Sequence, residues 1–98
     1  MEETKSKDKE LLKILGKTGS YEILKELEKE SKRFSDLAKI VTHSTLAKRL
    51  LELEKFNLIR RKVVDSRPPV VEYVLTEKGR QILKFFKEIV ENESSAKK

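Results

Sequence analysis

The chain has 98 residues, of which 37% are hydrophobic and 41% are charged, and its formal net charge is +6. This length predicts one domain covering residues 1–98, ordered from about 8 to 92, and the absence of cysteine excludes disulfides, thiolate metal sites and thiol switches. A single histidine cannot form a zinc site and no apolar run reaches the ~20 residues of a membrane span, so we expect a cytoplasmic protein without metal or cofactor.

Helical spacing of apolar residues predicts two helices in the first third of the chain. The first covers residues 8–15 and ends before Gly16, and the residues that precede it are expected to be disordered. The second ends in the charged stretch 28–30. Thr18 and Ser20 are both suited to cap its N-terminus. The apolar residues of this second helix are Tyr21, Ile23, Leu24 and Leu27.

Two further helices are predicted in the middle of the chain. A short one covers residues 35–41, with Ser35 as its N-cap and Asp36 in its first turn. Thr42 then caps a longer helix that extends to about residue 56. One face of this longer helix is apolar and the opposite face is polar. The apolar face consists of Leu46, Leu50 and Leu53.

The period of the sequence pattern changes after residue 57. Residues 58–65 and 70–75 are rich in β-branched side chains, which predicts two strands. Two consecutive prolines at 68–69 interrupt any continuous ladder, so the strands are expected to form an antiparallel hairpin. Thr76 is the expected N-cap of a final helix over residues 77–93. Residues 94–98 are expected to be disordered.

The order of the predicted elements is typical of a winged helix-turn-helix fold. Such a fold is of the α+β class but mainly helical, with a three-helix core, a β-hairpin wing and, here, additional N- and C-terminal helices that would serve dimerisation. The helix-turn-helix would cover about 35–56 and the wing about 58–75.

The excess positive charge is concentrated in one region of the chain. Residues 31–67 contain ten lysines and arginines against four acidic residues, whereas the remainder holds thirteen of each sign. A concentrated basic region is expected of a surface that binds phosphates, and the alternative is a solvated lysine-rich surface. The dominance of Lys and Glu together with the absence of Trp is also typical of heat-adapted proteins.

Polar side chains gather near the start of the longer helix, where helix-turn-helix proteins contact base edges in the major groove. Their hydroxyl, imidazole and cationic groups can bind phosphates and bases. The alternative is an amphipathic helix in an unrelated bundle. The DNA contacts predicted for this helix-turn-helix are Ser35, Thr42, His43, Ser44, Thr45, Lys48 and Arg49.

The hairpin supplies a second set of candidate DNA contacts. Arg60 and Lys62 lie on its first strand, and Ser66 and Arg67 lie at its tip. A basic wing can follow the DNA backbone and place arginine in the minor groove. Alternatively, these charges protect an edge strand from pairing.

The final helix is more apolar than a helix that packs only on its own core. A second copy of the chain is therefore expected to cover the extra width, unless the first helix covers all of it. The predicted dimer interface consists of Leu11, Leu12, Leu15, Ile82, Phe85, Phe86, Ile89 and Val90.

The motifs of this chain, taken in order, resemble those of the HxlR family of winged-helix transcription regulators, within the MarR-like group. The resemblance covers about residues 11–90. It includes Pro-Pro-Val-Val-Glu-Tyr at 68–73 and Leu-Thr-Glu-Lys-Gly at 75–79. Further matching segments are 16–17, 23–27, 33–37, 46–54 and 58–61.

The resemblance implies a homodimer joined through its terminal helices, with the helix from His43 in the major groove and Arg67 near the wing tip. Three departures stand out. The N-terminal cysteine that many relatives use for sensing is absent, Thr18 replaces an aromatic residue, and Leu51 replaces a commonly polar one.

These observations predict a sequence-specific, double-stranded DNA-binding transcription regulator that acts as a homodimer. Two alternatives remain: an architectural DNA-binding protein of low sequence specificity, and a winged-helix module for protein interaction. Catalysis is not expected, because no nucleophile–base set, glycine-rich phosphate loop or metal-ligand spacing is present.

Overall fold

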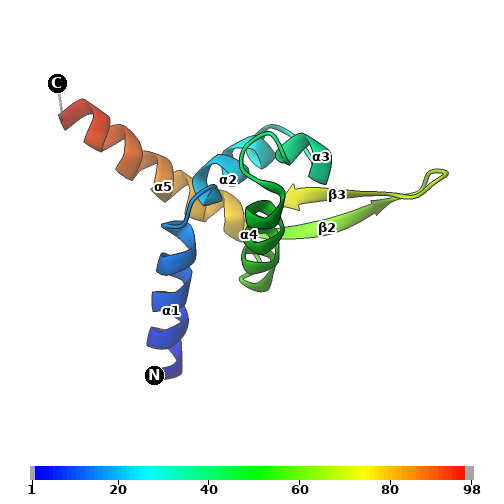
Figure 1. Cartoon of the computed structure of the whole chain (residues 1–98). Coiled ribbons are helices and arrows are strands. Elements are labelled where there is room, and N and C mark those ends of the chain that lie inside the picture. Colours follow the sequence, from blue (N-terminus) through cyan, green and yellow to red (C-terminus); the bar gives the residue numbers. More distant parts are fainter. Residues whose placement is uncertain (1, 97–98) are drawn as a thin grey trace.

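Figure 1 shows a helical body from which a β-hairpin extends on one side and two helices extend on the other. The computed structural model describes residues 2–96, with side-chain surroundings for 9–91; Met1 and residues 97–98, where disorder is expected from the sequence, lie outside the described residues. In chain order the elements are α1 (Glu2–Leu15), α2 (Ser20–Lys29), β1 (Lys32–Arg33), α3 (Phe34–Leu37), α4 (His43–Lys55), β2 (Ile59–Val64), β3 (Val70–Leu75) and α5 (Glu77–Ala96).

The three strands form one antiparallel sheet in the order β1–β3–β2. Strands β2 and β3 pair from Ile59 opposite Leu75 to Val64 opposite Val70, which confirms the predicted hairpin. Strand β1 adds two residues to the other edge of β3. The sequence pattern does not indicate β1, because two charged residues carry no strand periodicity. The mainly helical chain with its small antiparallel sheet confirms the winged helix-turn-helix fold class.

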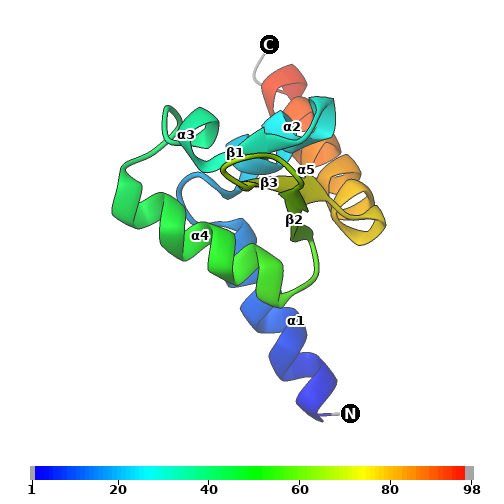
Figure 2. The same cartoon turned by 90° about the vertical axis from the view of Figure 1, so that its right-hand side faces the viewer.

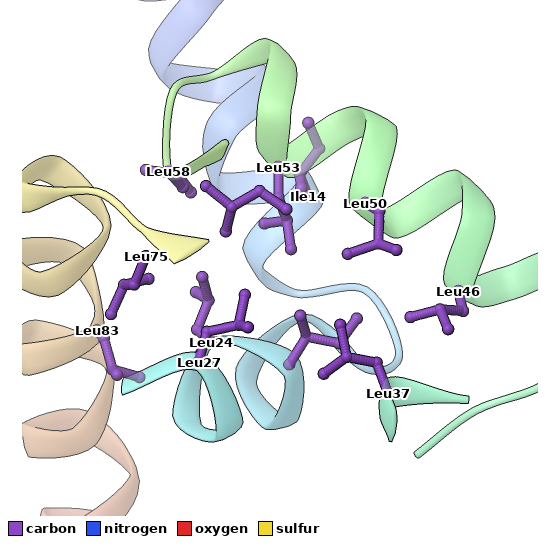
Figure 3. Close-up of a cluster of buried hydrophobic side chains, with 12 residues drawn as sticks. Ile14, Leu24, Leu27, Leu37, Leu46, Leu50, Leu53, Leu58, Leu75 and Leu83 are labelled. Carbon is purple, nitrogen blue, oxygen red and sulfur yellow. The ribbon is translucent and has the colours of Figure 1, made fainter. Parts of the chain in front are cut away.

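The hydrophobic core lies between α2, α4, α5 and the base of the hairpin. Figure 3 shows leucines from these elements pointing toward one another. All three leucines predicted on the inner face of α4 are buried there. The hydroxyl of Ser20 is also buried, and it donates a hydrogen bond to the carbonyl of Ile14 over 2.5 Å, so this polar group is satisfied inside the core. The buried apolar residues are Ile14, Ile23, Leu24, Leu27, Leu37, Leu46, Leu50, Leu53, Leu58, Ile59, Leu75 and Leu83.

Two predicted helix starts are wrong. Helix α2 has Gly19 as its N-cap, in a left-handed conformation with φ of 90°, and neither Thr18 nor Ser20 caps it. The reason is that the Ser20 hydroxyl is already bonded to the core-facing carbonyl of Ile14. Helix α3 covers only Phe34–Leu37, so Ser35 lies in its first turn. The N-cap there is Arg33, whose backbone N–H donates to the Asp36 carboxylate over 3.1 Å.

The other boundaries are close to the predicted ones. Thr42 is the N-cap of α4, and Thr76 accepts a hydrogen bond from the Gly79 amide at the start of α5. The terminal helices are longer than expected, since α1 begins at Glu2 and α5 continues to Ala96. Neither of them, nor any other helix in the described part of the chain, combines the length and apolar character of a membrane span.

Helix α5 is attached to the body through α2. The rings of Tyr21 and Phe86 lie 4.6 Å apart between centroids, and the Lys87 ammonium donates to the Glu28 carboxylate over 2.5 Å. Beyond these contacts α1 and α5 diverge on the side of the body opposite the wing (Figure 1). The wing and the two terminal helices therefore present their surfaces on opposite sides of the body.

Candidate nucleic-acid interface

The N-terminus of α4 is fixed by its capping threonine. The Thr42 hydroxyl accepts a hydrogen bond from the Thr45 amide over 3.4 Å and donates one to the Thr45 hydroxyl over 3.0 Å. These bonds satisfy one of the free amides at the helix start. They also occupy part of the polar capacity of Thr45, which is half-buried. The cap thus fixes the residue at which α4 begins, and it leaves Thr45 with less hydrogen-bonding capacity for other partners.

Helix α4 presents one long face to solvent beside the wing (Figure 2). Ser44 and Lys48, four residues apart, lie on it and are exposed, as predicted. His43 is also exposed, and its ring packs edge-on against Phe34 of α3 with centroids 5.0 Å apart. Ser35 is exposed on α3. The structure therefore brings the His43 imidazole, the Ser44 hydroxyl and the Lys48 ammonium to the first half of α4, with the Ser35 hydroxyl on α3.

Arg49 lies in different surroundings from those expected. Its Nε donates to the carbonyl of Thr18 over 2.9 Å and its Nη1 donates to the Glu52 carboxylate over 2.6 Å. Lys17 binds the other oxygen of Glu52 over 2.8 Å. With its side chain 12% exposed, Arg49 ties α4 to the loop between α1 and α2. Arg49 therefore helps to hold α4 in position, in place of the DNA contact predicted from the sequence.

The network around Glu52 predicts a pH-dependent stability. Burial opposes ionisation of Glu52, but hydrogen bonds from Lys17 and Arg49 outweigh it and hold the pKa of the carboxyl below its usual value of 4.5. A lowered folded-state pKa contributes stability above the unfolded pKa, and this contribution is lost as the pH falls through the folded value. Glu52→Gln should therefore lower the free energy of unfolding by about 1 kcal/mol at neutral pH.

The difference between wild type and Glu52→Gln should begin to shrink as the pH falls below about 4.5, and it should vanish below the lowered folded-state pKa of Glu52, where both proteins carry a neutral side chain. Urea unfolding followed by circular dichroism between pH 3 and pH 7 measures it. Glu88→Gln, a change at an exposed site in the middle of α5, is the matched control and should change stability little. A Glu52→Gln difference that stays constant down to pH 3 would show that the network is not held by the ionised carboxylate.

The wing carries its charges on both faces of β2. The alternation of the strand places Arg60 and Lys62 on one face, and both are exposed. Arg61 points to the other face, where its Nε donates to the Glu54 carboxylate of α4 over 3.2 Å. This ion pair connects the wing to α4. The sequence does not predict it, because the pattern of the few residues between Glu54 and the strand does not show how the strand is oriented relative to the helix. One face of β2 thus exposes Arg60 and Lys62 to solvent, whereas the other face connects the wing to α4.

The tip of the wing projects away from the body (Figure 1). Arg67 is exposed there, and it precedes Pro68 through a cis peptide bond. Ser66 is half-buried, and its hydroxyl donates to the carbonyl of Pro68 over 2.8 Å. The Ser66 hydroxyl therefore holds the loop in shape, whereas Arg67 is exposed to solvent.

Both carboxylates of α4 are paired with basic side chains. Glu52 binds Lys17 and Arg49, and Glu54 binds Arg61. Within residues 9–91, whose side chains the structure describes, no ion pair involves Lys48, Lys55, Arg60, Lys62 or Arg67. The uncompensated charge of the middle region is thus carried by side chains on the exposed face of α4 and on the wing, where it would attract a polyanion.

A second surface lies between α1 and α5. An apolar groove of about 330 Å³ runs between them. Leu12, Phe85 and Ile89 line it and are 69%, 64% and 63% exposed, although they are large and apolar. Every residue of the predicted dimer interface lines the groove except Val90, which is half-buried outside it. The remaining lining residues are Leu11, Leu15, Gly16, Ile82 and Phe86.

Known proteins with similar sequences and folds are regulators of transcription. A family profile described as HxlR-like helix-turn-helix matches residues 14–97. The HTH-type transcriptional regulator YodB of Bacillus subtilis (strain 168) is 34% identical over 79 residues, which are 78% of this chain and 70% of YodB. The reduced form of YodB superposes with a TM-score of 0.75 at 32% identity, over 85% of this chain and 84% of that one.

A structure from Enterococcus faecalis V583, assigned to the MarR family of transcriptional regulators, has a TM-score of 0.78 at 30% identity. The match covers 96% of this chain and 88% of that structure.

Among the described residues, no cluster of three or more metal-binding side chains occurs. The similar proteins are transcription regulators, and the exposed polar face of α4 is the kind of surface with which helix-turn-helix proteins contact DNA.

Proposed function

The chain belongs to the HxlR-like helix-turn-helix family of transcription regulators, and from this premise we propose that it binds specific double-stranded DNA sequences as a homodimer. In this proposal α4 enters the major groove and the wing lies along the flanking minor groove. The protein is a non-catalytic regulator of the cytoplasm, as its similarity to HTH-type transcriptional regulators suggests.

The observation that carries this proposal is the exposed face of α4. Ser44 and Lys48 point outward from it, while the two carboxylates of the same helix, Glu52 and Glu54, are each bound to basic residues. A serine hydroxyl can donate to or accept from base edges, and a lysine binds guanine or phosphate. Pairing of the carboxylates removes the repulsion that free acidic groups would exert on DNA.

The wing supports the same orientation. Arg60 and Lys62 share one face of β2, and Arg67 stands at the tip. An arginine at the tip can enter a narrow minor groove, where A·T-rich tracts concentrate negative potential. All of the proposed contacts lie within residues 35–67, on the helix-turn-helix and on the first strand and tip of the wing. We propose Ser35, Thr42, His43, Ser44, Thr45, Lys48, Arg60, Lys62, Ser66 and Arg67 as the DNA-contacting set.

A low-specificity architectural role is the second candidate function, since the basic wing alone would suit it. Polar groups able to contact base edges on α4 favour the specific regulator. Selection of bound sequences from a random duplex pool separates the two. Enrichment of a defined site supports the proposal, whereas binding without enrichment indicates a coating protein and absence of binding indicates a protein-interaction module.

Affinity for duplex DNA should fall steeply with salt. Each neutralised phosphate contributes about −0.9 to the slope of log affinity against log salt, so we expect a slope of roughly −4 to −8 for a dimer. Arg67→Ala should make the slope less negative by about 2, because each dimer loses two cationic side chains that displace counterions from the DNA. Fluorescence anisotropy at several salt concentrations measures this.

Lys84→Ala, on the exposed side of α5 away from the wing, is the matched control and should leave the slope unchanged. Ser44→Ala should instead alter which sequences are selected while affecting salt dependence little, because a neutral hydroxyl reads bases without displacing counterions. A slope near zero for the wild type would remove the DNA-binding proposal.

A further inference from the structure

One large apolar side chain stands on the DNA-facing surface of α4. Leu51 is 68% exposed, whereas the other leucines of the helix, Leu46, Leu50 and Leu53, are buried in the core. It does not belong to the core cluster or to the residues packed against it, and it does not line the groove between α1 and α5. Neither the fold nor the proposed dimer therefore uses this side chain.

Leu51 shares its face of α4 with the residues proposed to read DNA. Ser44, Ala47, Lys48 and Leu51 follow the spacing i, i+3, i+4 and i+7, and all four are exposed. Seven residues of helix advance about 10 Å, or roughly three base pairs of B-DNA. If Ser44 lies over one base pair, Leu51 lies over another base pair further along the same groove.

A leucine cannot form hydrogen bonds, so its partner in the major groove must be apolar. The C5-methyl group of thymine is the apolar feature that the major-groove edges of the bases present. We propose that Leu51, assisted by the exposed Ala47 one turn earlier, recognises the C5-methyl of a pyrimidine in each half-site. This inference deepens the proposed function and depends on it.

The proposal defines a chemical class of ligand. Thymine and 5-methylcytosine both carry the C5-methyl group, whereas uracil and cytosine lack it. Burial of one methyl-sized group contributes about 0.8 kcal/mol, which corresponds to roughly a fourfold change in affinity. Recognition should therefore be modest at one site, specific for position and independent of salt.

Replacement of single thymines by deoxyuridine tests the contact on a duplex selected from a random pool. Deoxyuridine keeps every hydrogen-bonding group of thymine and removes only the methyl. One position in each half-site should lose about fourfold in affinity for the wild-type protein. A cytosine placed at that position should lose affinity, and 5-methylcytosine should recover about fourfold relative to cytosine.

Leu51→Ala completes a double-mutant cycle. The variant loses the contact in both half-sites, so it should bind the thymine duplex about sixteenfold more weakly than the wild type and should no longer distinguish thymine from deoxyuridine at that position. Lys48→Ala is the matched control on the same face: it should weaken binding but keep the methyl preference. Because Leu51 is exposed, all of these proteins should melt at nearly the same temperature.

The failures of the two proposals are distinguishable. Enrichment of a site in which no thymine is sensitive to deoxyuridine overturns the Leu51 contact and leaves the DNA-reading function intact. A sensitive thymine whose effect persists in Leu51→Ala also overturns it, since the methyl then acts through DNA shape. Absence of any enrichment overturns both proposals.

Discussion

Ile89→Glu is expected to convert the proposed homodimer into folded monomers. Ile89 is 63% exposed in the groove between α1 and α5, so the substitution leaves the protomer core untouched. In the proposed dimer, two-fold symmetry would place two such glutamates in an apolar contact, where each unpaired charge costs several kcal/mol. The dissociation constant of the dimer should rise at least about a hundredfold, a difference of roughly 3 kcal/mol. Sedimentation equilibrium over a range of protein concentrations measures it.

The choice of residue matters for this test. Phe86 also lines the groove, but its ring packs on Tyr21 and attaches α5 to α2, so a charge there would disturb the protomer as well. Phe85→Glu, at a 64% exposed side chain, should act like Ile89→Glu. Lys84→Glu introduces the same carboxylate on the other side of α5 and should remain a dimer. If Ile89→Glu and Phe85→Glu dimerise like the wild type, the interface lies elsewhere.

Loss of the dimer should also change the DNA footprint. Two copies of α4 related by symmetry reach successive major grooves only when they lie about 34–36 Å apart, or a multiple of this distance. The wild type should therefore protect an inverted repeat with half-site centres about 10 or about 20 base pairs apart. The monomeric variant should protect a single half-site at higher concentration. A single half-site protected by the wild type would contradict the dimeric reader.

Gly79→Ala is expected to destabilise the protein by about 3 kcal/mol and to lower Tm by roughly 10–20 °C. A Cβ at this buried position would lie 2.1 Å from the Leu58 carbonyl oxygen and 2.6 Å from Cδ1 of Leu75. The carbonyl cannot withdraw cheaply, because it accepts hydrogen bonds from the Thr76 amide and hydroxyl over 3.0 Å each. In an ordinary helix the same substitution stabilises by about 1 kcal/mol, so the sign itself is diagnostic.

Gly16→Ala is the matched control for this substitution. A Cβ there would meet only backbone carbonyls at 3.5 and 3.7 Å, which is ordinary contact, so its stability should be unchanged or slightly raised. Thermal unfolding followed by circular dichroism measures both variants. Equal melting temperatures for Gly79→Ala and the wild type would mean that the start of α5 can move away from β2 without cost. The wing would then be less firmly connected to α5 than the structure indicates.

The sequence by itself determined the elements whose signals are local. Thr42 and Thr76 cap helices within three residues of the groups they bind, and the leucine spacing of α4 directs one face inward whatever surrounds it. The hairpin follows equally from β-branched strands on either side of two prolines. These features specify the winged helix and the exposed polar face of α4, because each depends on neighbours a few residues away.

Contacts between distant segments were decided only by the tertiary structure. Arg49 resembles a DNA contact in the sequence, yet it binds the Thr18 carbonyl 31 residues earlier, and a local pattern cannot show this. Strand β1 forms because β3 offers it an open edge, and Gly79 is required because the Leu58 carbonyl occupies the place of its Cβ. The groove likewise exists because α1 and α5, from opposite ends of the chain, lie beside each other. Local spacing sets which side chains are apolar or capping, whereas packing of remote segments decides which of them stay exposed for function.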